Sequence, residues 1–226
     1  VSGLNITEDS YGNNMLDSYR TGIPGYDIVE RDDGCFTLNG DSDAYTEEYE
    51  KWDDIQKSVE KRITAGRVLD IGCGGGKHAL HFQNKGLDTW GLDNSPKALE
   101  LCKERGIKNL IMSHIYDFNS SVLNEVNTVL MLGNNLGLLQ NYELAKNFFK
   151  EAESFCSDNS TIYAETLDPH GKAFVSDIDK AYIQNNKAQH RPPGQIRCRI
   201  RYLKYTTPWA DYLFVSPDEL KFILEG

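Results

Sequence analysis

The fold of this chain is decided by the stretch Arg67-Val68-Leu69-Asp70-Ile71-Gly72-Cys73-Gly74-Gly75-Gly76-Lys77-His78. An aliphatic strand pattern closes on an acid and gives way to four glycines, and the apolar pattern of a helix follows at once at Ala79, Leu80 and Phe82. A strand, a tight turn and a helix N-terminus in succession form the place where an open α/β sheet binds a nucleoside-bearing cofactor.

The spacing of the glycines separates one class of cofactor from another. A dinucleotide site has the pattern Gly-x-Gly-x-x-Gly, which would require a third glycine at position 77 after Gly72 and Gly74. That position holds Lys77, and an acid, Asp70, stands before the first glycine. A nicotinamide site does not explain this acid, so the pattern disfavours an NAD-dependent oxidoreductase.

Strand and helix patterns alternate from this turn onward. Ser95-Pro96 is an N-cap followed by proline at the first helical position, and Gly86 and Gly106 end the first two helices. The expected strands are 67–71, 87–92, 109–113, 126–132 and 161–167, and the expected helices are 77–84, 97–105 and 142–156. This alternation predicts an α/β fold with a doubly wound, mostly parallel sheet.

Two motifs in this frame resemble those of a known enzyme family. Residues 68–76 resemble the first motif of class I S-adenosylmethionine-dependent methyltransferases, and residues 91–96 resemble the second, with Asp93 placed 21 residues beyond Gly72. The resemblance covers residues 66–168 well and the remainder loosely. It implies a Rossmann-like fold, S-adenosylmethionine as the cofactor and in-line transfer of a methyl group.

The resemblance also implies roles for individual residues. Gly72 and Gly74 would admit the methionine part and the ribose close to the backbone, Asp70 would reach the ammonium group through water, and Asp93 would accept the ribose hydroxyls. Two other interpretations stay open: Asp70 as an acceptor for N–H groups of the turn, and Asp93 as a charge at a helix N-terminus. The expected cofactor-binding set is Asp70, Gly72, Cys73, Gly74, Asp93, Asn94, His114, Ile115, Leu132 and Gly133.

The third motif departs from the family pattern. The family normally has an acid after the third strand, facing the adenine amino group, but here His114 takes that position and the N–H of Ile115 would meet a ring nitrogen. Asp117 is the candidate if the register slips.

The sequence identifies no catalytic residue. The loop 132–137 lacks the Asn-Pro-Pro-Tyr or Asp-Pro-Pro-Tyr signature of many amino-group methyltransferases, so Asn134 and Asn135 are candidates for positioning only. His170, after the fifth strand, is a candidate general base or a surface histidine. His78 and His81 share one helix face but have no further ligand nearby in sequence, so no metal site is predicted.

Residues 1–64 are predicted to form an arm, a hairpin and a lid helix. Residues 1–24 contain few apolar positions, and Asp33-Gly34 predicts a two-residue hairpin turn between strands at 26–30 and 35–38. Apolar residues then recur at helical spacing over 45–63. The aromatic residues of this helix either pack it or cover the sulfonium of the cofactor, whose charge suits an aromatic face: Tyr45, Tyr49 and Trp52.

Residues 65–226 are predicted to form the S-adenosylmethionine-binding domain, with 169–215 as an insertion on the substrate side. Residues 169–194 are polar and partly helical, 196–205 and 211–215 have strand patterns, and Ser216 opens a helix. The arginines of the first strand form either the solvated face of an edge strand or a grip on an anionic substrate: Arg197, Arg199 and Arg201.

The family sheet usually ends with an antiparallel pair after a helix of the kind that starts near Ser216, and the chain ends at Gly226. We therefore expect a fragment that lacks the final strands; the alternative is that 196–205 and 211–215 complete the sheet. In the first case the outer edge of the fifth strand is exposed or covered by 196–215. An exposed edge is a route to a homodimer or to aggregation.

Composition bounds the class of protein. A chain of 226 residues with 39% hydrophobic content is long enough for one well-buried α/β domain. Five scattered cysteines, no leading signal pattern and no apolar run long enough to cross a membrane predict reduced thiols in the cytoplasm. The net charge of −10 is concentrated in residues 1–60, with 15 acids and 4 bases, which disfavours unaided binding of nucleic acid.

The preferred function is therefore methyl transfer to a small-molecule acceptor. Two alternatives stay open: an RNA or protein methyltransferase, and a protein that binds S-adenosylmethionine without transferring methyl, as a sensor or partner subunit.

Overall fold

A five-stranded parallel sheet forms the centre of the computed structural model, which describes residues 3–40 and 42–225. Its strand order is β5-β4-β3-β6-β7, so the chain winds outward from β3 in one direction and then, from β6, in the other. This confirms the doubly wound α/β fold, with its switch point between β3 and β6. The strands are β3 (Arg67–Ile71), β4 (Asp88–Asp93), β5 (Asn109–Met112), β6 (Val126–Met131) and β7 (Cys156–Ala164).

Helices cover both faces of this sheet. On one face, α3 (Lys77–Asn84) packs against Val68 and Leu130, and α4 (Pro96–Glu104) adjoins α3. On the other face, α5 (Tyr142–Phe155) and α7 (Pro217–Leu224) pack against Leu69 and Val129. Successive residues of a strand point to opposite faces, so strands buried on both sides have nearly continuous apolar sequences.

The predicted elements of this half agree with the structure except at the fifth strand. Strand β7 begins at Cys156, directly after α5, and ends at Ala164 rather than at residue 167. Its register against β6 shifts between Val126 and Thr128, and Asn159 adopts a positive φ of 62°. The irregular pairing at the start of β7 accommodates the polar residues 157–160, which have no strand pattern in the sequence.

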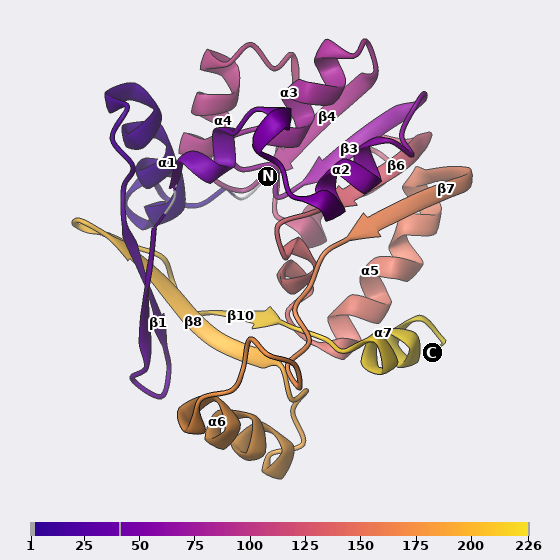
Figure 1. Cartoon of the computed structure of the whole chain (residues 1–226). Helices are drawn as coiled ribbons and strands as arrows, with labels where there is room; N and C mark the ends of the chain where they lie inside the picture. Colours follow the sequence, from indigo (N-terminus) through magenta and orange to yellow (C-terminus); the bar gives the residue numbers. More distant parts are fainter. Residues whose placement is uncertain (1–2, 41, 226) are drawn as a thin grey trace.

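A second, antiparallel sheet has the order β10-β8-β1-β2, with β9 paired to β8. Its strands are β1 (Asp27–Arg31), β2 (Phe36–Asn39), β8 (Gln195–Tyr202), β9 (Tyr205–Thr206) and β10 (Ala210–Leu213). The predicted hairpin and the predicted C-terminal strands thus form one sheet, joined where Val29 faces Ile200. The carboxyl ends of the parallel strands point toward this sheet (Figure 1).

The sequence left open whether the strands at 196–205 and 211–215 complete the parallel sheet, and the described residues answer this question. There, strands β8 and β10 do not complete the parallel sheet, and β7 pairs on one edge only, with β6. The segment after β10 passes the end of β7, where the N–H of Val215 donates to the hydroxyl of Thr166 at 3.2 Å.

The three arginines of β8 lie on the outer face of the antiparallel sheet. Arg199 and Arg201 form ion pairs with Glu30 at 2.9 and 3.4 Å, and Arg197 lies 3.5 Å from Asp211. Because these pairs are partly exposed, they contribute little to stability. Their acidic partners favour the solvated-face interpretation over a grip on an anionic substrate.

The N-terminal arm predicted over residues 1–24 is wrong for the residues that the structure describes; residues 1 and 2 lie outside them. Helix α1 (Ser10–Thr21) packs against α4 and β8. Its buried face is largely polar and includes Asn13, Asn14 and Ser18. The hydrophobic periodicity that reveals most helices is therefore weak here.

The single lid helix predicted over 45–63 is also wrong. Two 3₁₀ turns, Ser42–Thr46 and Tyr49–Lys51, precede a short helix α2 (Asp54–Glu60). The chain is extended at Trp52, and Asp53 accepts the N–H of Gln56 at 2.8 Å as the N-cap of α2. An N-cap within an apolar period starts a new helix and breaks the old one.

The hairpin turn has three residues rather than two. The N–H of Arg31 donates to the carbonyl of Cys35 at 2.7 Å, which leaves residues 32–34 as the loop. Gly34 occupies the left-handed position with φ of 86°, as expected in a three-residue hairpin.

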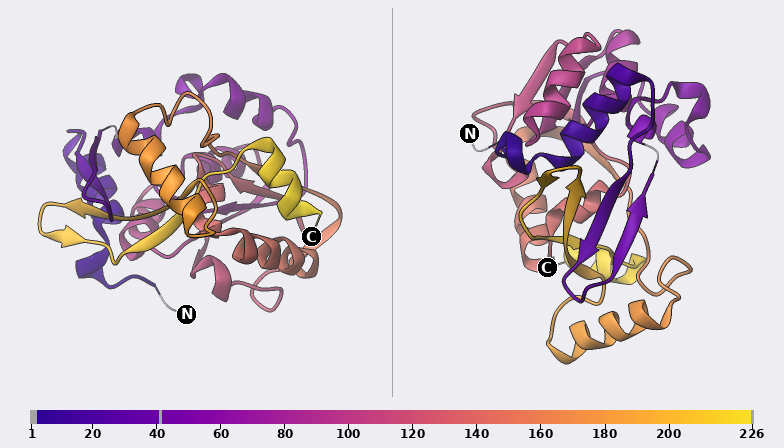
Figure 2. Two further views of the ribbon diagram at one scale, coloured as in Figure 1. Left: turned by 90° about the horizontal axis from the view of Figure 1, so that it is seen from below. Right: turned by 90° about the vertical axis from the view of Figure 1, so that its left-hand side faces the viewer.

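The predicted helical insertion contains α6 (Asp177–Ala188), which lies beyond the antiparallel sheet and remote from α3 and α4 (Figure 2). It is held to the hairpin by an ion pair between Asp179 and Arg31 at 2.8 Å and by a hydrogen bond from Tyr182 to Asp32. None of the helices in the described residues is both long and apolar enough to span a bilayer.

Candidate functional site

The glycine turn connects β3 to α3 at the carboxyl edge of the parallel sheet. The N–H of Gly72 donates to the carbonyl of Leu92 at 2.8 Å, which ties the turn to β4. Gly72 and Gly74 have φ of +70° and +53°, where a side chain would be strained. A Cβ on Gly72 would also lie 2.6 Å from the amide nitrogen of Asn135. Backbone conformation therefore requires glycine at both positions, and crowding requires it at Gly72 as well.

Asp70 lies two residues before this turn and is 2% exposed. Its carboxylate accepts the backbone N–H of Ala79 at the start of α3, but Oδ2 has no hydrogen-bond partner among the described residues. Burial, together with the nearby charge of Asp93, raises the pKa of Asp70 to about 7, although the N–H of Ala79 lowers it. An unpartnered carboxylate oxygen is costly inside a protein, so this site is suited to a donor that the chain itself does not supply.

Asp93 ends β4 and joins two turns. Its Oδ2 accepts the N–H of Gly74 at 2.8 Å and its Oδ1 accepts the N–H of Ser95 at 2.9 Å. The side chain of Ser95, which accepts the N–H of Ala98 at 2.9 Å, is the cap of α4. Burial raises the pKa of Asp93 although these N–H groups lower it. The bond to Gly74 was not predicted, and it places this carboxylate against the glycine turn.

The other expected cofactor positions of β4 and β5 lie on adjacent strand ends. Asn94 follows β4, and its carbonyl accepts the N–H of Leu4 at 2.8 Å. His114 follows β5, and its Nδ1 accepts the N–H of Tyr116 at 3.4 Å, so His114 caps a short 3₁₀ turn. Ile115 is the buried first residue of that turn.

The loop after β6 contacts the glycine turn directly. The amide nitrogen of Asn135 donates to the carbonyls of Ile71 and Gly72 at 3.0 and 2.8 Å. Asn134 has a left-handed φ of 66°, and its buried Oδ1 has no partner among the described residues. These contacts show that Asn135 holds the turn, whereas the positioning role expected of Asn134 and Asn135 stays a prediction.

Leu132 and Gly133 precede these asparagines. Leu132 is 4% exposed and packs in the core beside Val68. Gly133 is exposed, has φ of 67°, and donates its N–H to Glu165 at 2.7 Å. Glu165 directly follows β7, so this hydrogen bond joins the ends of the two neighbouring strands.

The candidate base His170 lies apart from the turn. It is exposed, its N–H donates to Asp168, and its Nε2 lies 3.8 Å from Glu219 of α7. Among the described residues, no hydrogen bond or ion pair joins His170 to the glycine turn.

Three tyrosines from distant parts of the chain gather beside the turn. Tyr11 of α1 and Tyr45 meet edge to face with ring centroids 5.9 Å apart. The ring of Tyr45 lies 3.4 Å from the Cβ position of Gly74. Tyr212 of β10 donates its hydroxyl to the carbonyl of Asn134 at 2.6 Å. Burial raises the pKa of all three phenols, that of Tyr45 to about 12, so they are neutral.

The sequence indicated only one of these tyrosines. Tyr45 was one of three aromatic residues considered for a lid, whereas Tyr11 and Tyr212 had no local signal. The other two lid candidates pack on α3 instead: Tyr49 stacks on His81 at 5.0 Å, and Trp52 meets His78 at 4.7 Å.

The two histidines of α3 that contact Tyr49 and Trp52 are not arranged to bind a metal ion in the described part of the chain. His78 is buried, which lowers its pKa to about 3, and Nε2 of His81 lies 3.1 Å from Glu60. Within residues 3–40 and 42–225, no three His, Cys, Asp or Glu side chains are grouped to hold a metal ion.

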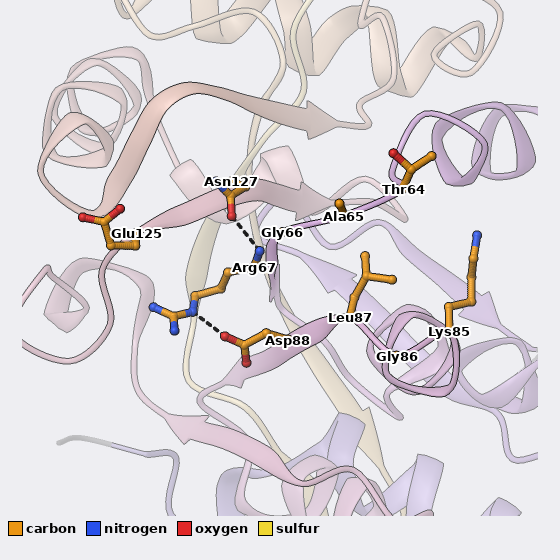
Figure 3. Close-up of a pocket in the computed structure, with 10 residues that line it drawn as sticks. All are labelled: Thr64, Ala65, Gly66, Arg67, Lys85, Gly86, Leu87, Asp88, Glu125 and Asn127. Atoms are coloured by element: carbon orange, nitrogen blue, oxygen red, sulfur yellow. Dashed lines mark hydrogen bonds and ion pairs between the residues drawn. The ribbon is translucent and has the colours of Figure 1, made fainter.

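A separate depression lies at the amino ends of β3, β4 and β6 (Figure 3). There Arg67 forms an ion pair with Asp88 at 2.7 Å and donates its N–H to Asn127. Ligands of open α/β sheets bind at the carboxyl ends of the strands, so this depression is at the wrong edge for the cofactor.

Comparisons with known proteins agree with this geometry. Residues 68–159 match a family model described as a methyltransferase domain, while a search of curated proteins gave no significant match. A SAM-dependent methyltransferase from Bacteroides fragilis, solved with S-adenosyl-L-homocysteine, has a TM-score of 0.82 and 21% identity over 99% of this chain and 88% of that chain.

Two Streptomyces structures are similar at lower scores. The CcbJ methyltransferase from Streptomyces caelestis has a TM-score of 0.56 and 13% identity over 96% of this chain and 86% of its own. DesVI from Streptomyces venezuelae has a TM-score of 0.52 and 14% identity over 75% of this chain and 80% of its own. At such identities the likeness establishes a shared fold. The matched domain, the sheet order and the glycine turn together show that residues 68–159 form a methyltransferase domain with the fold of the class I S-adenosylmethionine-dependent methyltransferases.

Proposed function

We propose that this protein transfers the methyl group of S-adenosylmethionine to a small-molecule acceptor, and that the donor binds across the carboxyl ends of β3, β4, β5 and β6. The observation that carries the proposal is the pair of carboxylates at the glycine turn. Asp93 is bonded to Gly74, and Asp70 retains an oxygen without a partner. Both stand where a nucleoside-bearing ligand meets a sheet of this order.

The two acids suit the two polar ends of the donor's ribosyl-methionine part. Asp70 can receive the ammonium group, directly or through water, and that cation would lower the pKa that burial has raised. Each carboxylate oxygen of Asp93 accepts one backbone N–H, from Gly74 or Ser95, and a carboxylate has about four acceptor sites. Lone pairs thus remain for the ribose hydroxyls.

The remaining positions of the proposed donor site follow the strand ends. The backbone at Gly72, Cys73 and Gly74 would contact the methionine part, with Leu132 and Gly133 on the β6 side. Asn94, His114 and Ile115 would border the adenine. His114 caps its own turn through Nδ1, so Nε2 is the atom left to face the ring.

The small-molecule part of the proposal is supported by what lies over the turn. Tyr11, Tyr45 and Tyr212 approach it from α1, the 3₁₀ turn and β10, which leaves a site bounded by secondary structure on several sides. The acidic surplus of residues 1–60 also disfavours a nucleic acid chain. Alignment of donor and acceptor can contribute roughly 7–11 kcal/mol to such a transfer.

Calorimetric titration with S-adenosylhomocysteine tests the donor site. Asp93→Ala removes the proposed ribose acceptor and the bond to Gly74, so we expect the affinity for S-adenosylhomocysteine to fall by at least about 100-fold, because two hydrogen bonds to a charged group contribute roughly 3 kcal/mol or more. Asp88→Asn is the matched control, because Asp88 begins the same strand at the opposite edge. Equal affinities of the two variants would contradict the assignment.

Transfer itself is tested with methyl-labelled donor and a low-molecular-mass cell extract. Incorporation of label into a small product supports the proposed activity. Label in RNA or protein fractions instead would overturn the small-molecule acceptor. Tight binding of S-adenosylhomocysteine with no transfer to any fraction would favour a binding protein.

A further inference from the structure

A second buried acid with an unpartnered oxygen is Asp27, at the start of β1. It is 1% exposed, and its Oδ2 accepts the amide N–H of Asn14 at 3.0 Å. Asn39, its partner on β2, also favours the charged carboxylate, but no hydrogen bond of ordinary geometry reaches Oδ1 among the described residues. A buried carboxylate oxygen without a donor indicates a binding function, since it lowers stability as it stands.

Asp27 belongs to the inner face of the antiparallel sheet. Side chains alternate along a strand, so Asp27, Val29 and Arg31 share one face of β1, while Ile28 and Glu30 face outward with Arg199. Arg31, the cation on this face, is already held by Asp33 and Asp179, both at 2.8 Å. The charge of Asp27 is therefore not neutralised by its own strand.

The tyrosines connect Asp27 to the proposed donor site. Tyr45 interacts electrostatically with both Asp27 and Asp93, and its ring lies against Gly74. Tyr11 interacts with Asp27, Tyr45 and Tyr212. Asp27 therefore interacts with the same neutral phenol that borders the glycine turn.

We propose that Asp27 binds the methyl acceptor and that the acceptor is an amine, an inference that rests on the proposed methyl transfer. A carboxylate that accepts one amide N–H, from Asn14, and lies near neutral aromatic rings attracts an ammonium group. It repels carboxylate and phosphate acceptors, because the cation on this face of β1 is already paired. Neutral hydroxyl acceptors would leave the charge of Asp27 uncompensated.

The same carboxylate can take the proton that amine methylation releases. The bound ammonium group first gives one proton to Asp27, which frees the nitrogen lone pair. That lone pair forms the new N–CH₃ bond as the S–CH₃ bond breaks, and the electron pair of the broken bond goes to sulfur, giving S-adenosylhomocysteine and a methylated ammonium product. Burial raises the pKa of Asp27 from its ordinary value, which makes it a better proton acceptor than an exposed aspartate.

The test compares Asp27→Asn with Asp211→Asn. Asp211 lies on β10 of the same sheet, but it faces outward and pairs with Arg197 at 3.5 Å. We expect Asp27→Asn to lose at least 100-fold in methyl transfer and to bind S-adenosylhomocysteine within threefold of the unmodified protein. Its thermal midpoint should be equal or higher, because the change removes an uncompensated buried charge. Asp211→Asn should retain transfer.

The chemistry of the labelled product identifies the acceptor class. An N-methyl product from the extract remains labelled after mild alkali and binds a cation exchanger at neutral pH. Labelled methanol released by alkali, or label in an anionic or uncharged product, would overturn the proposal. Transfer by Asp27→Asn within threefold of the unmodified protein would overturn it as well. If the unmodified protein failed to bind S-adenosylhomocysteine, the proposed function itself would fail, which is a distinct result.

Discussion

At the scale of single residues, the buried acids distinguish this protein from a fold optimised for stability. Among the described residues, Asp27 and Asp70 each keep a buried carboxylate oxygen without a partner. Asp70 precedes the glycine turn, and Asp27 interacts with Tyr45, whose ring lies against Gly74. Asp9, which is equally buried, has both carboxylate oxygens hydrogen-bonded to donors at the starts of α1 and α4. Unpartnered acids near a ligand site are where a protein gives up stability for binding.

Asp70 gives a testable pH dependence. Its pKa in the folded protein is about 7, above the ordinary value of 3.8, so between these values the folded state holds a proton that the unfolded chain has released. Stability should therefore decrease as pH rises through this range. At pH 8 we expect Asp70→Asn to be more stable than the unmodified protein by about 1–4 kcal/mol, with a much smaller gain at pH 4.

Urea unfolding at the two pH values measures this difference. Asp88→Asn is the control, because Asp88 is an exposed acid on the adjacent strand. Parallel stability profiles for the unmodified protein and Asp70→Asn would show that Asp70 is not a strained buried acid.

At the scale of elements, one carboxylate joins the N-terminal helix to the Rossmann-like core. Asp9 accepts the N–H of Gly12 in α1 at 3.0 Å, and the N–H of Lys97 and the hydroxyl of Ser95 in α4 at 2.9 and 2.8 Å. It therefore satisfies donors at the N-termini of two helices. This contact holds Tyr11 in place, since Tyr11 lies in the first turn of α1.

We expect Asp9→Ala to destabilise the protein by about 2–4 kcal/mol, since it removes the cap of α1 and leaves the buried donors of Ser95 and Lys97 at the start of α4 without their acceptor. Asp53→Ala, which removes the single cap of α2, should cost about 1 kcal/mol. Chemical denaturation of the two variants measures both values. Similar losses would mean that Asp9 contributes no more than an ordinary cap.

At the scale of the whole molecule, the antiparallel sheet draws its strands from both ends of the chain. Strand β1 pairs with β8, so residues on the two sides of the expected division at 64/65 form one sheet. Helix α1 contacts both α4 and β8, and Tyr212 connects β10 to the loop after β6. The division of the chain into 1–64 and 65–226 stays a prediction, and it can be tested by asking whether the two parts unfold separately.

We expect the two sheets to unfold together. Trp90 lies in β4 of the parallel sheet and Trp209 precedes β10 of the antiparallel sheet, so each reports on one sheet. In variants that keep one of these and replace the other two tryptophans by Phe, the fluorescence and far-ultraviolet circular dichroism midpoints in urea should coincide. A separate, earlier transition at Trp209 would indicate an independently unfolding sheet.

The sequence by itself determined the donor half of this protein. Glycines that need a positive φ, an acid before them and an acid at the next strand end are local features, and β3, α3, β4 and α4 were predicted from residues that neighbour each other along the chain. Short-range periodicity and capping are sufficient for such elements.

Only the tertiary structure decided the part of the molecule to which we assign the acceptor. Asp27, Tyr11, Tyr45 and Tyr212 come from segments with a polar buried face, an interrupted helix or a strand that pairs across about 170 residues. No hydrophobic periodicity along the sequence predicts these contacts, because their residues are far apart in the chain. The segments that surround the proposed acceptor are held by hydrogen bonds between distant polar groups, and such pairings become evident only when the chain has folded.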